Sequence, residues 1–202
     1  MLETEVKFFL LDPQGFRRRL QQSGALSDGG SFETNHRYDD ANHRLLAGRC
    51  LLRLRSDRRH RLTYKRPHAS GDRQFKIHDE LEIEVSDFDT THQILEALGF
   101  HLAQTYEKRR ETFELNQVEI CLDQLPFGHF AEIEGTPESI PAVAATLGLS
   151  WRHRILANYL QIFDTIRRSL NLPFVDITFD NFRSVQDDLT ELIRQFEEDP
   201  SA

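Results

Sequence analysis

The feature that most limits the possible folds of this chain is a Glu-x-Glu strand pattern that occurs three times. The first predicted strand alternates charged and apolar residues, so Glu3, Glu5 and Lys7 share one strand face. The pattern returns at 80–85 and at 132–134. After each occurrence a capping residue or a proline opens a predicted helix that ends near a glycine. The sequence therefore predicts repeated units of strand, helix and glycine stop.

Other predicted strands carry basic residues at alternate positions. They cover 52–55, 61–65, 106–113 and 118–122, and their basic side chains include Arg53, Arg55, Lys65, Lys108 and Arg110. A single alternating strand most often turns its charged face to solvent. A solvated sheet, however, has no need to separate acidic strands from basic ones. The sorting of charge by strand therefore predicts that the charged faces line an interior.

A sheet of about eight strands can close into a barrel whose interior holds side chains or one small ligand. Burial of unpaired charges would cost several kcal/mol per ion, so the acidic and basic residues must meet each other or a ligand. Carboxylates two residues apart on a strand suit Mg²⁺ or Mn²⁺, and arginine matches phosphate oxygens with two donors at once. We predict an α+β fold in which a β-barrel has a polar, charged lumen and helices packed outside. Its expected ligands are divalent metal and a polyphosphate.

The composition excludes several other classes of protein. The formal net charge of −8 argues against a general nucleic-acid binder, which needs an excess of Lys and Arg. An RNA-binding patch at 49–66, where arginines are frequent, is an alternative, but the alternation places much of that charge inside. The first apolar run, 8–11, is too short for a signal sequence or a membrane span. We therefore expect a cytoplasmic protein that binds neither nucleic acid nor membrane.

Several segments outside the charged strands also receive predictions. The segments 27–31 and 67–79 are expected to form a short turn and a polar loop, the latter containing Ser70, Gly71 and Asp72. Beyond about residue 165 apolar residues fall at helical spacing, which predicts an outer amphipathic helix containing Val185, Leu189, Leu192, Ile193 and Phe196. We predict a tunnel domain at 1–165 and a helical extension at 166–202. Trp151 and Tyr159 are interpreted as packing residues.

In their order along roughly residues 1 to 160, these motifs resemble those of the CYTH family, also called triphosphate tunnel metalloenzymes. The family's hallmark, Glu-x-Glu-x-Lys, matches Glu3-Thr4-Glu5-Val6-Lys7. Further matches are Leu52-Arg53-Leu54-Arg55, Thr63-Tyr64-Lys65, Glu82-Ile83-Glu84, Glu107-Lys108-Arg109-Arg110, Leu122-Asp123 and Glu132-Ile133-Glu134.

The resemblance implies an eight-stranded antiparallel tunnel and assigns roles to its charged residues. The implied metal ligands, for Mg²⁺ or Mn²⁺, are Glu3, Glu5, Asp123, Glu132 and Glu134. The implied triphosphate contacts are Lys7, Arg53, Arg55, Lys65, Lys108 and Arg110, among which Lys7, Arg55 and Lys65 are the candidate catalytic residues. Glu82 and Glu84 would support substrate binding by orienting basic side chains or by binding metal indirectly.

The resemblance leaves three activities open. Hydrolases of the family use water to cleave tripolyphosphate or thiamine triphosphate, whereas class IV adenylyl cyclases use the ribose hydroxyl of ATP. The cyclases often carry a His-Phe pair before the hallmark, and none precedes Glu3 here, which favours hydrolysis. A non-catalytic binder of polyphosphate or nucleotide is the third reading, although it would have no need for all the acidic motifs. The expected assembly is a monomer or a homodimer.

Overall fold

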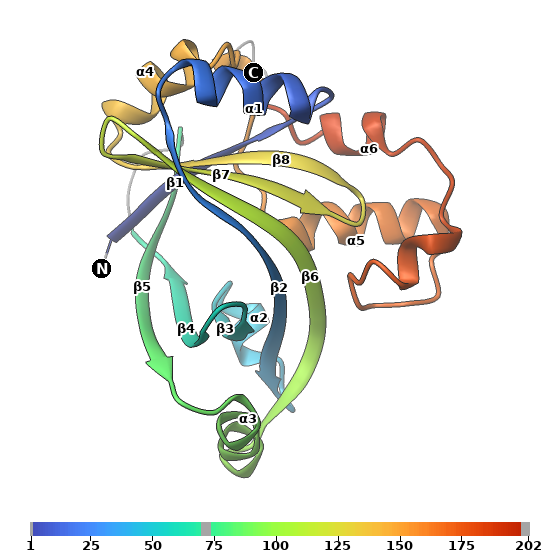
Figure 1. Ribbon diagram of the computed structural model, residues 1–202. Helices are drawn as coiled ribbons and strands as arrows, with labels where there is room; N and C mark the ends of the chain where they lie inside the picture. Colours follow the sequence, from blue (N-terminus) through green and yellow to red (C-terminus); the bar gives the residue numbers. More distant parts are fainter. Residues whose placement is uncertain (1, 70–73, 199–202) are drawn as a thin grey trace.

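The computed structural model, which describes residues 2–69 and 74–198, contains a closed antiparallel β-barrel (Figure 1). Its strands are β1 (Leu2–Phe9), β2 (Leu26–Asp40), β3 (Leu51–Ser56), β4 (His60–Pro67), β5 (Lys76–Val85), β6 (Phe100–Leu115), β7 (Val118–Leu125) and β8 (Gly128–Glu134). Their order around the barrel is β5-β4-β3-β2-β6-β7-β8-β1, and pairing between β5 and β1 closes it. The predicted eight-stranded barrel is therefore confirmed.

Alternation along each strand separates a charged lumen from an apolar outer face. On β1 the lumen side carries Glu3, Glu5 and Lys7, while Val6 and Phe8 enter the core outside the barrel. All of these side chains are buried. Because side chains alternate with a period of two, a one-residue shift in register would move the charges into the apolar core. The pattern thus fixes the register of the strand.

Helices pack above the barrel, to its right and at its lower end in the view of Figure 1, and leave strands at the front of that view without a covering helix. They are α1 (Pro13–Gln22), α2 (Arg44–Ala47), α3 (Phe88–Ala97), α4 (Ser139–Thr146), α5 (Tyr159–Leu170) and α6 (Thr190–Arg194), with 3₁₀ turns at Trp151–His153 and Asn181–Ser184. Phe16 and Leu20 of α1 join Ile140 and Val143 of α4 in one core cluster against the strands. In the described part of the chain, no helix is both long and apolar enough to cross a membrane.

The C-terminal third packs against the barrel as one apolar cluster. α5 begins at a capping box in which the Asn158 side chain and Gln161 exchange hydrogen bonds with each other's backbone. Ile162 and Ile166 of α5 share a core cluster with Phe130 of β8. A short strand, β9 (Arg154–Ile155), pairs with β1. α5 runs through the predicted division at residue 165, and the division into two domains remains a prediction.

The predicted C-terminal helix is much shorter than expected. Only α6 is helical, and Val185 and Leu189 lie before it. The Asp188 carboxylate accepts a hydrogen bond from the Thr190 backbone N–H at 3.0 Å, an Asx-type turn just before the helix, while the N-cap residue Leu189 provides no side-chain cap. Val185 and Leu189 still pack in the same apolar cluster as Ile193. Apolar spacing identified the buried residues but not the backbone conformation.

Two predicted connections are wrong in part because strands extend into them. The expected turn at 27–31 belongs to β2, where a bulge between Ser27 and Gly29 lets the glycine adopt a φ of +86° within the sheet. The expected loop at 67–79 overlaps β5, which begins at Lys76 and pairs with β1 there. The part of that loop at Ser70, Gly71 and Asp72 lies outside the described residues.

Candidate active site

The barrel encloses a cavity of about 1550 Å³ lined mainly by charged side chains. It collects most of the predicted site residues: Glu3, Glu5, Lys7, Arg53, Arg55, Lys65, Glu82, Lys108, Arg110, Glu132 and Glu134. Asp123 and Glu84 are the predicted residues outside its lining. Residues as far apart in sequence as Glu3 and Glu134 line the same cavity because six of the barrel strands, β1, β3, β4, β5, β6 and β8, turn these side chains inward.

The two acidic residues of β1 are each held by lysines. The Lys65 Nζ donates to both Glu3 carboxylate oxygens at 2.6 Å, and the Lys7 Nζ donates to Glu5 Oε1 at 2.8 Å. Lys76 of β5 also donates to Glu5. Burial and the neighbouring Glu5 raise the pKa of Glu3, whereas Lys7 and Lys76 outweigh burial and lower the pKa of Glu5. The two carboxylates therefore differ in how strongly the protein neutralises them.

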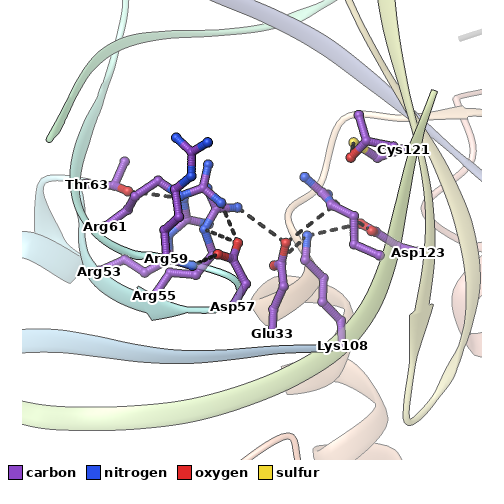
Figure 2. Close-up of polar contacts among 12 residues, drawn as sticks. Glu33, Arg53, Arg55, Asp57, Arg59, Arg61, Thr63, Lys108, Cys121 and Asp123 are labelled. Atoms are coloured by element: carbon purple, nitrogen blue, oxygen red, sulfur yellow. Dashed lines mark hydrogen bonds and ion pairs between the residues drawn. The ribbon is translucent and has the colours of Figure 1, made fainter. Parts of the chain in front are cut away.

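A basic group on β3 faces a buried carboxylate of β2 (Figure 2). The Arg55 Nη1 lies 3.4 Å from Glu33 Oε1, and its other acidic neighbours, Asp57 and Glu82, are each 3.6 Å away. The Arg53 guanidinium donates to Tyr106 Oη at 3.3 Å and to Thr63 Oγ1 at 3.2 Å. Arg55 is thus surrounded by acids at distances longer than a strong ionic hydrogen bond. Its donors can approach an anionic ligand more closely than they approach these acids.

A second basic group is organised by Asp123, which is fully buried. Arg110 donates to Asp123 through Nε at 2.7 Å and Nη2 at 2.6 Å. Lys108 donates to Asp123 at 3.1 Å, and Figure 2 shows these two side chains together. The Tyr159 hydroxyl donates to Asp123 Oδ2 at 2.9 Å. The predicted metal ligand Asp123 therefore has both oxygens engaged by the protein. In this arrangement it orients Lys108 and Arg110 toward the cavity.

Tyr159 does more than pack, which extends its interpretation from sequence. Its ring lies 5.1 Å from the ring of Phe130, as expected for a core residue. The ring also faces the lumen, where the Lys7 Nζ lies 5.3 Å from the ring centroid. Burial and Asp123 raise the pKa of the Tyr159 hydroxyl well above its usual value, so it remains a donor. α5 thus contributes a neutral hydrogen-bond donor to the charged interior.

Replacing Tyr159 with phenylalanine is expected to lower the free energy of unfolding by about 1–2 kcal/mol, since Asp123 loses one of its donors while the ring is retained. Urea denaturation measures this change. The matched control is Tyr64→Phe, because Tyr64 donates only to Cys50 Sγ, at 3.4 Å. An equally small effect for both variants would show that the Tyr159 hydroxyl contributes nothing to the network.

The two glutamates of β8 have opposite electrostatic surroundings. Glu132 accepts from Arg110 and lies 3.2 Å from the Lys7 Nζ, and these cations outweigh burial and hold its pKa well below the usual range. Burial, with the carboxylates of Glu3, Glu119 and Glu5, instead raises the pKa of Glu134 to about 8. Glu134 is directly opposite Glu5 on β1. This end of the lumen therefore concentrates negative charge.

The donor set at that end fits a divalent cation. Carboxylate oxygens are the ligands that Mg²⁺ and Mn²⁺ prefer, and the mutual repulsion that raises the pKa of Glu134 is what a bound cation would relieve. Among the described residues, no three acidic, histidine or cysteine side chains are already grouped to hold an ion. Glu3 and Glu5 would therefore exchange lysine contacts for metal, while Glu134 has the least competition for its oxygens.

The acidic residues of β5 differ in whether they line the cavity. Glu82 accepts from Thr63 Oγ1 at 2.7 Å and lies near Arg53 and Arg55. Glu84 is exposed, pairs with Arg59 at 3.2 Å and does not line the cavity. The neighbouring Glu80 lines the cavity and lies 2.9 Å from the Lys65 Nζ. The structure thus supports an orienting position for Glu82 and places Glu84 outside the cavity.

Sequence reasoning missed Glu33 and Lys76, both of which belong to the network. Glu33 belongs to β2, a strand that was not predicted. Within 31–39, however, hydrophilic residues such as Glu33 and Arg37 alternate with ring-bearing residues such as Phe32 and Tyr38. Lys76 was placed in a loop, although its spacing continues the lumen face of β5 from His78 and Glu80. In both cases period-two alternation carried the signal. Nearby glycines and polar residues made it resemble a connection.

The family model of the CYTH domain matches residues 1–149. The chain belongs to the CYTH family. The family predicted from the order of the charged motifs is thereby confirmed. Enzymes of the CYTH family are triphosphatases or adenylyl cyclases and use divalent metals. Among curated proteins, none matches this chain.

Solved structures share the CYTH barrel. A candidate adenylate cyclase from Vibrio parahaemolyticus is 23% identical, with a TM-score of 0.72, and the alignment covers 81% of this chain and 98% of that one. The PH1012 protein from Pyrococcus horikoshii is 27% identical, with a TM-score of 0.67 and coverage of 79% and 98%. A candidate adenylyl cyclase from Hippeastrum with a dominant triphosphatase activity is 17% identical, with a TM-score of 0.58 and coverage of 80% and 95%. The Vibrio and Hippeastrum proteins, at 23% and 17% identity, support the fold alone.

Proposed function

We propose that this CYTH protein hydrolyses a triphosphate, with inorganic tripolyphosphate as its first candidate substrate, in a reaction that depends on Mg²⁺ or Mn²⁺. Water adds to the terminal phosphorus, the bridging P–O bond breaks, and the products are orthophosphate, pyrophosphate and a proton. The observation that carries the proposal is Arg55, a buried guanidinium whose three acidic neighbours all lie at 3.4–3.6 Å. Such a cation is poised to gain stronger contacts with phosphate oxygens.

The residues of the barrel would act mainly by placing charge. Arg53 and Arg55 on β3, with Lys65 on β4, would bind the phosphate oxygens from one side, and Lys108 and Arg110 on β6 from the other. These side chains are held in advance by Glu33, Glu82 and Asp123. Preorganised cations stabilise the charge that develops during phosphoryl transfer without a cost of reorganisation at that moment. No nucleophilic side chain is needed.

The acidic end of the lumen would hold the metal. Glu134 is the foremost ligand candidate, with Glu3 and Glu5 beside it. A bound divalent cation supplies neutralisation of phosphate charge and a lower pKa for water. The protein's part is to hold these carboxylates close together, and a bound cation would favour the ionised form of Glu134, whose pKa the protein raises. Lys7 lies between Glu5 and Glu132, where it balances their charge and can contact a phosphate group.

Product analysis by phosphorus NMR tests the proposal. The purified protein is incubated with tripolyphosphate, thiamine triphosphate or ATP, each with Mg²⁺, with Mn²⁺ or with EDTA. Metal-dependent release of orthophosphate from tripolyphosphate is the expected result. Cyclic AMP and pyrophosphate from ATP would replace hydrolysis with the adenylyl cyclase reaction. Binding without any product would leave a polyphosphate or nucleotide binder.

A further inference from the structure

Two arginines directly opposite each other face the lumen near one end of the barrel. Arg37 on β2 is the register partner of Arg53 on β3, and both line the cavity. Like charges in directly opposed positions destabilise a sheet. Arg53 has hydrogen bonds to the neutral groups of Tyr106 and Thr63, and its acidic neighbour Glu82 lies 3.7 Å away. An anion between the two guanidinium groups would remove the repulsion.

The protein compensates Arg37 only weakly. Its side chain is 13% exposed, yet its nearest acidic atom, Asp39 Oδ2, is 3.9 Å away. Asp39 is itself committed to the backbone, since it accepts from the N–H groups of Leu45 and Leu46 at 3.0 Å. The other contact of Arg37 is a long one, 3.4 Å, to the Gln104 amide oxygen. Burial lowers the pKa of Arg37, which is consistent with a cation that lacks a close counter-charge.

Further arginines line the cavity, and one of them is connected to Arg37 through residues of β6 and the C-terminal segment. Gln104, which Arg37 contacts, donates to the Val175 carbonyl at 2.6 Å, and Arg167 of α5 donates to the adjacent Phe174 carbonyl at 3.0 Å. Arg167 is therefore linked to Arg37 through a short series of contacts. Arg49, an exposed residue before β3, also lines the cavity. The acidic residue of α5 that lines it, Asp164, pairs with Arg168 at 2.6 Å.

This arginine end lies away from the carboxylates that fit metal. Along β2, Arg37 is four residues from Glu33, which corresponds to about 13 Å. Along β8, Glu134 and Glu132 line the cavity, whereas Phe130, two residues before Glu132, packs against the Tyr159 ring of α5. The cavity volume of about 1550 Å³ also exceeds the roughly 300–1,000 Å³ typical of a small-molecule site. There is space and positive charge beyond the group that would bind three phosphates.

We infer that Arg37, together with Arg49 and Arg167 of the same cavity lining, forms a subsite for an additional phosphate group, so that the preferred substrate is a linear polyphosphate of four or more phosphates. The inference rests on the proposed function, because the reacting end of the chain would lie among the residues assigned above. Arg37 would act as a specificity determinant rather than as a catalytic residue. The distal phosphates would lie between its guanidinium group and that of Arg53.

The charge at this end favours inorganic phosphate over the organic part of other triphosphates. The thiazolium ring of thiamine triphosphate is itself a cation and would meet repulsion from the arginines. Adenosine is neutral and would add no negative charge to the opposed pair of Arg37 and Arg53, whose acidic neighbours Asp39 and Glu82 lie 3.9 and 3.7 Å away. A phosphate group supplies both negative charge and oxygens that a guanidinium binds with two donors. Linear polyphosphate is therefore the class of ligand that supplies both the negative charge and the hydrogen-bond acceptors that these arginines need.

The test compares turnover of tetrapolyphosphate and tripolyphosphate by the full-length protein with Mg²⁺. We expect a higher kcat/KM for tetrapolyphosphate and a loss of this preference, by about tenfold to a hundredfold, in Arg37→Gln. Turnover of tripolyphosphate should stay close to that of the unmodified protein. Arg49→Gln, at an exposed position, provides a second variant should Arg37→Gln fail to fold. Arg18→Gln on α1 is the matched control, since it removes the same charge outside the cavity.

The outcomes separate this inference from the proposed function. Turnover of tripolyphosphate with no preference for the longer chain, or a preference that both cavity variants retain, would overturn the subsite and leave the triphosphatase proposal intact. A loss confined to ATP would instead assign this end to a nucleotide and also overturn it. If no substrate is cleaved, calorimetric titration still decides, because equal affinities for the two polyphosphates would contradict the subsite.

Discussion

Replacing Arg55 with alanine is expected to lower kcat/KM for tripolyphosphate by about 10²–10³-fold, the usual effect of removing one preorganised group that stabilises a transition state. Burial and the adjacent Arg53 lower the pKa of Arg55, and the acids around it approach no closer than 3.4 Å. A phosphate group of the substrate could therefore form shorter, stronger hydrogen bonds with Arg55 than these acids do. Steady-state kinetics at saturating Mg²⁺, with the thermal midpoint as a check on folding, measures the effect.

Two further variants show whether the geometry of Arg55 matters as well as its charge. Arg55→Lys keeps the positive charge but loses the planar pair of donors, so only part of the activity should return. Arg18→Ala on α1 is the matched control because its side chain is 67% exposed and lies outside the cavity. Normal turnover by a folded Arg55→Ala protein would show that Arg55 does not contact the reacting phosphate.

Much of the barrel could be predicted because charge alternation and the closed fold impose the same constraint. Glu3, Glu5 and Lys7 had to share a face, and the opposite face of β1 supplies Val6 and Phe8 to the core. Glycine-containing segments were less predictable. Residues 27–31 resemble a turn, yet a bulge at Gly29 keeps them in β2 because β6 pairs along this length. Long-range pairing determined the conformation there.

The sequence predicted which residues make up the candidate site, but not which of them contact one another. Sequence alternation indicates which residues face the lumen, but it does not state which carboxylate meets which cation. Asp123 could be read from its motif as a metal ligand, whereas the structure surrounds it with Lys108, Arg110 and Tyr159. Tyr159 enters this network from α5, more than 30 residues after β7 ends. A contact of that kind depends on how the helix closes over the barrel.

Replacing Glu33 with glutamine is expected to destabilise the ligand-free protein by about 3 kcal/mol, because it removes a charge that compensates several buried cations. The side chain is 2% exposed and lies 3.4 Å from Arg55 and 3.5 Å from Lys108. Burial opposes its ionisation, but Lys108, Arg110, Arg55 and Arg53 outweigh burial and lower the pKa of Glu33 to about 2. For a chain of this size the loss corresponds to about 6–12 °C in the thermal midpoint.

The pH dependence of this effect has a definite sign. The folded-state pKa of Glu33 is below its usual value of 4.5, so its stabilisation is present above pH 4.5 and is lost as the pH falls toward 2. The difference in unfolding free energy between Glu33→Gln and the unmodified protein should therefore narrow over that range in urea denaturation. Glu111→Gln on the outer face of β6 is the matched control and should show no comparable difference.

Tripolyphosphate should restore the stability that Glu33→Gln loses, and this distinguishes an anion site from an ordinary buried ion pair. In EDTA, where no turnover is expected, the ligand brings negative charge to the same cations, Arg55 and Lys108, that Glu33 neutralises. The increase in thermal midpoint on adding tripolyphosphate should therefore be larger for Glu33→Gln than for the unmodified protein. A smaller or equal increase would mean that Glu33 positions these cations for phosphate rather than competing with it. The distinction matters because only a competing carboxylate must lose its close contacts before the substrate can bind.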